Sequence, residues 1–191
     1  MAAKSNLLNM ALCLFGICLV CSALLAGIYA VTAEPIEQAA RKALVAAISK
    51  VLPEGGEISE AQTAELGGQK YEYYASTRDG QPLGWAVKTS TVGFGGPLTL
   101  LAGITPDGQV YAVEVLSHSE TPGLGAKCTT DAHFMSQFRG FDTVARRLKL
   151  KKDGGDLDAI TASTITSRAY TLAVSNAVDL VATLNNHTEE E

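Results

Sequence analysis

An uninterrupted apolar run near the N-terminus limits what this chain can fold into more than any other feature of its sequence. The run is NLLNMALCLFGICLVCSALLAGIYAV, residues 6–31, and its only ionisable side chains are cysteines and Tyr29. About 20 apolar residues in a helix suffice to cross a hydrocarbon core roughly 30 Å thick. The run therefore predicts a transmembrane helix over residues 7–31, preceded by a tail at residues 1–6.

A cleavable signal peptide is the alternative for this run, because VTA before Glu34 has the small residues of a cleavage site. The apolar region of a signal peptide reaches about 15 residues, and this run is longer, so a retained anchor is favoured. Lys4 precedes the span, whereas Arg41 and Lys42 follow it only after acidic residues. Since positive flanks stay inside, we expect a single-pass inner-membrane protein with its soluble part on the periplasmic side.

Beyond the span, the order of patterns predicts an α+β domain. Apolar residues at helical spacing in EPIEQAARKALVAAISKVLP, with Pro35 in the first turn, predict a connecting helix within residues 32–56. Four alternating segments between residues 70 and 117 are separated by the turn signals RDGQP, GFGGP and PDGQ. They predict a meander of antiparallel strands, which is apolar on much of both faces and needs cover on both sides.

The remaining elements are predicted within a domain of residues 57–186, with a tail at 187–191. In VYAVEVLS, alternation places Val110 on the same face as Ala112. DAHFMSQF predicts a short helix and RRLKL a further strand. A long terminal helix is predicted at residues 165–184. Its apolar stripe would be Ala169, Leu172, Ala173, Asn176, Ala177 and Leu180.

Hydroxyl side chains crowd together just before the terminal helix, in DAITASTITSRAY at residues 158–170. One serine or threonine suffices to cap a helix. A helix N-terminus also stabilises an anion, and hydroxyls add hydrogen-bond donors. The cluster therefore predicts either an ordinary cap or a phosphate-binding site. Its five hydroxyls belong to Thr161, Ser163, Thr164, Thr166 and Ser167.

A second candidate segment is ETPGLGAK, residues 120–127, in which a Pro-Gly turn and a further glycine allow backbone to approach a flat ligand. A plain surface loop is the alternative. Other chemistry is excluded by composition. Cys128, alone outside the span, and three scattered histidines cannot form a zinc framework, so no metal site is expected. A net charge of -5 gives no basic face for nucleic acid.

Four features of the chain occur in order. These are one membrane helix, then HSETPGLGAK, then FMSQFRG, and finally DAITASTITS, which opens the last helix. In these four features the chain resembles the FMN-binding domain family. This family includes RnfG of the Rnf electron-transport complex and the related NqrC of the sodium-pumping NADH:quinone reductase. The resemblance covers essentially the whole chain. It implies a mostly antiparallel sheet flanked by helices and a covalently attached FMN, which carries the redox chemistry.

The family motif implies specific roles for residues near both blocks. A flavin transferase would recognise Asp158 and join the FMN phosphate to Thr164. Ala162 and Ser163 stand where Gly-Ala is usual. The other hydroxyls of the cluster would be neighbours of the phosphate. The residues implied near the flavin ring or ribityl chain are Glu120, Thr121, Pro122, Gly123, Leu124 and Gly125.

The resemblance also implies the setting in which the chain acts. It would be a membrane-anchored electron carrier, without substrate turnover of its own, in a complex that couples electron transfer between ferredoxin and NAD to ion translocation. Its partners would be membrane lipid, iron–sulfur membrane subunits and a further membrane protein with covalent FMN. The alternatives are an NqrC-type component of the sodium-pumping quinone reductase and a tethered module that binds flavin or phosphate reversibly.

Overall fold

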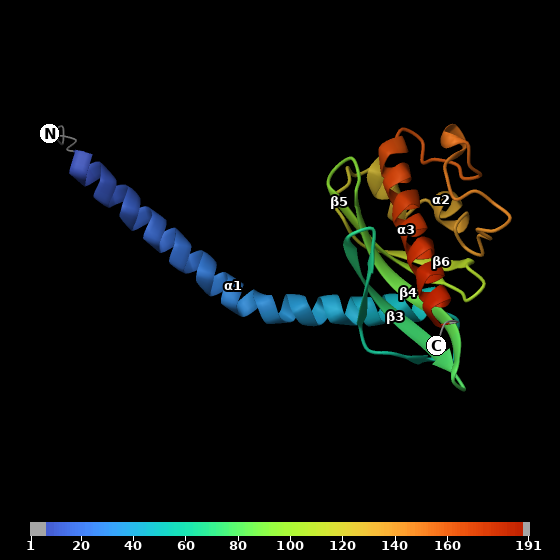
Figure 1. The fold of residues 1–191 in the computed structure, drawn as a ribbon. Helices are drawn as coiled ribbons and strands as arrows, with labels where there is room; N and C mark the ends of the chain where they lie inside the picture. Colours follow the sequence, from blue (N-terminus) through green and yellow to red (C-terminus); the bar gives the residue numbers. More distant parts are fainter. Residues whose placement is uncertain (1–6, 189–191) are drawn as a thin grey trace. The chain divides into compact units, whose positions relative to one another are not determined.

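The computed structural model describes residues 7–188 (Figure 1). The predicted tail at residues 1–6 and residues 189–191 lie outside the described residues. The chain divides into two compact units, Met1–Ala43 and Leu44–Glu191. The elements, in chain order, are α1 (Leu7–Val51), β1 (Glu57–Ile58), β2 (Gln62–Leu66), β3 (Gln69–Arg78), β4 (Gln81–Val92), β5 (Pro97–Ile104), β6 (Val110–His118), η1 (Gly125–Thr129), α2 (Ala132–Ser136), η2 (Lys151–Asp153) and α3 (Thr164–Thr188).

In the first unit, the structure describes α1 from Leu7 to Ala43. Its most apolar window has a mean hydropathy of 2.6 and no buried residue, and among the described residues α1 is the one helix long and apolar enough to cross a membrane. The helix runs without a break from the predicted span into the predicted connecting helix. The expectation that Pro35 begins a new helix is wrong, since Pro35 lies inside α1. Proline removes one backbone hydrogen bond there, and the helix continues through the hydrogen bonds of the turns on either side.

The second unit contains an antiparallel sheet, as predicted, with the strand order β1-β3-β4-β5-β6 and β2 paired to β3. The four long strands, β3 to β6, coincide with the four alternating segments of the sequence. This confirms the α+β class. Since neighbouring strands run in opposite directions, β4 and β6 end where β5 begins. Two connections therefore meet at one end of the sheet, and the start of α3 is anchored there because Thr91 Oγ1 of β4 donates to the Ala169 carbonyl at 2.9 Å.

Both faces of the sheet are covered, as the sequence requires. The last residues of α1, including Ile48 and Val51, pack on one face against Leu101. The long helix α3 lies across the other face (Figure 1), where the larger core is centred. In that core the rings of Phe138 and Tyr170 approach to 4.7 Å between centroids. Burial raises the pKa of the Tyr170 phenol.

The structure corrects the expected face of Val110. Val110 pairs with Ile104 while Ala112 pairs with Gly103, so one residue bulges out between them. A bulge reverses the alternation on one side of it. Val110 therefore lies in the core under α3, whereas Ala112 faces the end of α1.

Two further expectations need correction. RRLKL forms no strand, because its Leu150 makes only an isolated bridge, to Leu157. Leu172 is 56% exposed, since at 100° per residue it lies half a turn from the buried Tyr170. The short strands β1 and β2 were not predicted. Their residues are largely exposed, so they lack the apolar alternation by which strands are recognised.

Candidate functional site

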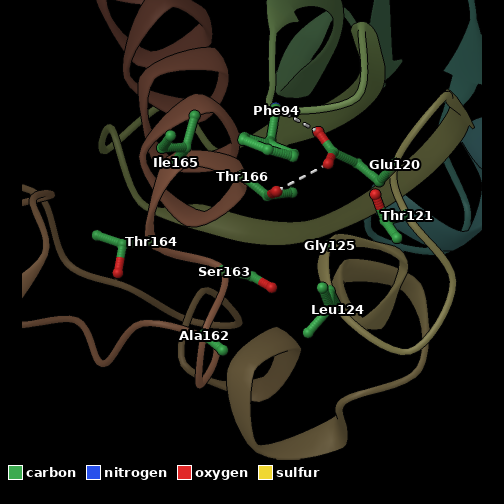
Figure 2. Close-up of a pocket in the computed structure, with 10 residues that line it drawn as sticks. All are labelled: Phe94, Glu120, Thr121, Leu124, Gly125, Ala162, Ser163, Thr164, Ile165 and Thr166. Atoms are coloured by element: carbon green, nitrogen blue, oxygen red, sulfur yellow. Dashed lines mark hydrogen bonds between the residues drawn. The ribbon is translucent and has the colours of Figure 1, made fainter.

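A pocket of about 350 Å³ lies where the β4–β5 connection, the loop after β6 and the start of α3 meet (Figure 2). It joins the two segments that the sequence singled out, which are about 40 positions apart in the chain. Its lining residues are Phe94, Glu120, Thr121, Leu124, Gly125, Ala162, Ser163, Thr164, Ile165 and Thr166.

The carboxylate of Glu120 holds the walls of this pocket together. It is only 6% exposed. Its Oε1 accepts from the Phe94 N–H at 2.9 Å, and its Oε2 accepts from Thr166 Oγ1 at 2.9 Å (Figure 2). Its Oε2 also accepts from the Gly95 N–H at 3.2 Å. Hydrogen bonds to a charged acceptor are about twice as strong as neutral ones. One side chain thus ties the β4–β5 connection to α3.

Two glycines make room for this carboxylate. A Cβ on Gly93 would lie 1.8 Å from Glu120 Oε1, and one on Gly125 would lie 2.4 Å from Oε2. Both distances are far inside van der Waals contact. Gly93 and Gly125 are therefore required by close packing around the buried carboxylate of Glu120.

The hydroxyl cluster separates into two groups. Ser167 Oγ donates to the Ser163 carbonyl at 2.9 Å and accepts from the Ile160 N–H at 3.0 Å, while Thr166 bonds Glu120. These two hydroxyls are satisfied inside the fold and have structural roles. Ser163 and Thr164 line the pocket, and exposed Thr161 lies outside its lining.

Ser163 and Thr164 differ in accessibility. Ser163 is 7% exposed and Thr164 is half-buried, at the first residue of α3. Figure 2 shows the Ser163 hydroxyl turned toward Leu124 and the side chain of Thr164 turned the opposite way. Thr164 is therefore more accessible to another protein than Ser163.

Ala162 adopts the left-handed conformation, with φ of 60°. This conformation costs a non-glycine residue roughly 1–2 kcal/mol. The turn into α3 thus requires the backbone geometry that glycine adopts freely, at the position where the family motif has glycine.

Replacing Ala162 by Gly is therefore expected to stabilise the fold by about 0.5–1 kcal/mol, since relief of strain exceeds the added entropy of the unfolded chain. Thermal unfolding of the full-length protein in detergent measures this. Ala182→Gly, at an exposed position inside α3, is the matched control and should destabilise by about 1 kcal/mol. A loss of stability in Ala162→Gly would contradict the strain.

Asp158 lies on the approach to this turn. Its backbone N–H donates to Gln137 Oε1 at 2.7 Å, and its carboxylate accepts from Lys151 Nζ at 2.8 Å, with His133 Nε2 at 4.0 Å. The Asp158 side chain is 45% exposed. Its backbone is fixed while its carboxylate remains accessible, which suits a residue recognised by another protein.

The pocket includes part of each predicted set of site residues. Thr121, Leu124 and Gly125 line it, whereas Pro122 and Gly123 are exposed outside its lining. Sequence reasoning missed Phe94 and Ile165. One signal could have indicated Phe94. It is an aromatic residue inside the glycine-rich GFGGP, and a tight turn does not require an aromatic side chain.

Cysteine, histidine and acidic side chains form no metal-binding site in the described part of the chain. Cys13, Cys18 and Cys21 are exposed along α1. Cys128 is buried, and desolvation, with a smaller contribution from the Glu120 charge, raises the pKa of its thiol to about 11. No group of three or more histidine, cysteine or acidic side chains in residues 7–188 has the spacing of a metal site.

Comparison with known proteins matches residues 93–179 to the FMN-binding domain family and residues 1–51 to the RnfG N-terminal region. The chain is 37% identical over 184 residues to the G subunit of the ion-translocating oxidoreductase complex of Vibrio cholerae, covering 90% of this chain and 87% of that one. It is 38% identical over 117 residues to the G subunit of the proton-translocating ferredoxin:NAD(+) oxidoreductase complex of Clostridium ljungdahlii, covering 60% and 62%.

A solved structure, NqrC of Shewanella oneidensis, shares the fold with a TM-score of 0.50 at 22% identity, covering 64% of this chain and 62% of that one. The fold and the matched domain thus define an FMN-binding protein. The chain belongs to the family of G subunits of ion-translocating oxidoreductase complexes, and with α1 it is a single-pass membrane protein. The alternative of an NqrC-type component is not favoured, because the likeness to NqrC extends to the fold alone.

The pocket fits the chemistry of FMN. Half-buried Thr164 and the buried hydroxyl of Ser163 lie at the start of a 25-residue helix, whose N–H groups favour a phosphate. Phe94, Leu124 and Ile165 offer apolar surface for a planar ring. A concave site with a few polar groups among apolar ones is typical of cofactor pockets.

Proposed function

We propose that this protein carries FMN covalently, as a phosphodiester on Thr164, and passes electrons between its neighbours in an ion-translocating oxidoreductase complex. The observation that carries the proposal is that one pocket is lined by both the 120–125 loop and the start of α3, with Thr164 accessible at the first turn. FMN supplies the redox chemistry, and this chain binds and orients it.

The support for Thr164 over its neighbours is the distribution of hydrogen bonds. Thr166 and Ser167 are buried and already bonded within the fold. Ser163 is buried against the pocket wall, and Thr161 lies outside the lining. Thr164 combines a position in the pocket with exposure to an attaching enzyme. Asp158, fixed through its backbone and open at its carboxylate, suits recognition by a flavin transferase.

Covalent attachment is tested by making the full-length protein with and without the flavin transferase and denaturing it in detergent. We expect fluorescent flavin on the denatured band only when the transferase is present. Flavin that colours the native protein but separates on denaturation would favour the alternative, a module that binds flavin reversibly.

The membrane setting is inferred from the flanking charges and from the resemblance. The soluble unit is proposed to lie on the periplasmic side, next to iron–sulfur membrane subunits and a further membrane protein with covalent FMN, and to have no substrate turnover of its own. The coupled reaction is proposed to be electron transfer between ferredoxin and NAD. Alkaline phosphatase fused after residue 191 should be active. An inactive fusion would contradict the periplasmic placement of the soluble unit.

A further inference from the structure

The hydroxyl of Ser163 is a buried polar group with unused hydrogen-bonding capacity. Among the side chains that the structure describes, only Ser163 Oγ and Thr89 Oγ1 are buried without a partner. Thr89 does not line the pocket at the start of α3, whereas Ser163 does. Leaving such a group unpaired is unfavourable, because it has lost its hydrogen bonds to water without replacing them. A ligand that supplied the missing partner would recover this cost.

Ser163 precedes α3 directly, at the position of a capping residue. Its carbonyl accepts the first helical hydrogen bond, from the Ser167 N–H at 3.0 Å. A capping serine normally turns its hydroxyl back to accept a backbone N–H of the first turn. Here the hydroxyl makes no such bond, and it points toward Leu124 (Figure 2). The first N–H groups of α3 are therefore not capped by Ser163 and remain available to an anion.

The electrostatics of the site favour a phosphate over a neutral group. The start of a long helix carries about half a positive charge. The nearby carboxylate of Glu120 is stabilised in place by three hydrogen-bond donors. Hydrogen bonds to charged groups are stronger than those to neutral groups, so a phosphate oxygen is the partner that Ser163 Oγ–H would bind most tightly.

We propose that Ser163 Oγ–H donates a hydrogen bond to a phosphate oxygen of FMN, and that the start of α3 therefore holds FMN without a covalent bond. This inference rests on the proposed function in taking FMN as the ligand, but it does not require the bond to Thr164. The family motif has alanine at this position, so the additional contact belongs to the TAST sequence of this chain.

The test uses the full-length protein made without the flavin transferase and purified in detergent. FMN is titrated into the wild type and Ser163→Ala, and binding is followed by flavin fluorescence. Riboflavin, which lacks the phosphate, is titrated in parallel. Ser175→Ala, a matched substitution in α3 outside the pocket lining, is the control.

We expect Ser163→Ala to bind FMN roughly tenfold more weakly, while its riboflavin affinity and the FMN affinity of Ser175→Ala stay unchanged. The ligand-free Ser163→Ala protein should unfold at the same temperature as the wild type or higher, because an unpaired buried hydroxyl is gone.

Three results would overturn the inference: wild-type FMN affinity in Ser163→Ala, an equal loss of FMN and riboflavin binding, or no saturable FMN binding by the wild type. None of these depends on covalent attachment. A chain that fails to be flavinylated at Thr164 could still pass this test, and a flavinylated chain could fail it.

Discussion

Replacing Glu120 by Ala should lower the free energy of unfolding by about 3 kcal/mol, the largest stability change that we expect from a single residue at the site. The substitution leaves the N–H groups of Phe94 and Gly95 and the Thr166 hydroxyl without their acceptor. It also frees the β4–β5 connection from α3, so flavin loading should fall as well. Thermal unfolding should shift down by roughly 10 °C.

Two further variants separate this network from general damage. Glu120→Gln keeps the size but offers one acceptor oxygen in place of two, so it should lose about half as much stability. Glu60→Ala, at an exposed acidic residue, should stay within about 0.5 kcal/mol of the wild type. Equal stability of Glu120→Ala and Glu60→Ala would show that Glu120 does not organise the pocket.

Replacing Thr164 by Val should abolish covalent flavin completely while leaving the fold intact. Valine has nearly the shape of threonine and lacks the hydroxyl that would form the phosphodiester. Thr164 is half-buried, and no hydrogen bond of its side chain contributes to the pocket wall. Flavin fluorescence of the denatured protein, made with the transferase, should therefore disappear with an unchanged unfolding temperature.

The matched control is Thr161→Val, which changes the first hydroxyl of the same motif. Because Thr161 is exposed and outside the pocket lining, covalent flavin should remain. Retention of flavin by Thr164→Val together with its loss from Thr161→Val would move the attachment site to Thr161.

The strands and helices of this fold follow from local patterns, which is why most were predictable. Alternation marks the central strands, and helical spacing marks α3. The bulge next to Val110 depends on pairing with β5, which no local pattern encodes. Helical spacing alone places Leu172 in the buried stripe because apolar residues occur on more than one side of α3, and only packing against the sheet selects the side.

The site was predictable in its two segments and not in its connections. ETPGLGAK and DAITASTITS were recognisable from glycine, hydroxyl and family patterns. That Glu120 joins them to Phe94 depends on contacts between residues 26 and 46 positions apart. Likewise, composition counts five hydroxyls, but only the turn of the helix decides that Thr166 and Ser167 bond inward.

The departure at Ala162 connects sequence and structure most closely. The family pattern has glycine there, and the structure gives this alanine a positive φ. The turn that presents Thr164 is therefore kept, at a cost in strain. We therefore propose that the TAST motif is still flavinylated.

The central claim is tested most directly by mass spectrometry of the tryptic peptide at residues 153–168, from protein made together with the flavin transferase. The account predicts that this peptide gains the mass of one FMN less one water, with fragment ions that assign the addition to Thr164. An unmodified peptide, or an addition assigned to Thr161, Ser163 or Thr166, would contradict it.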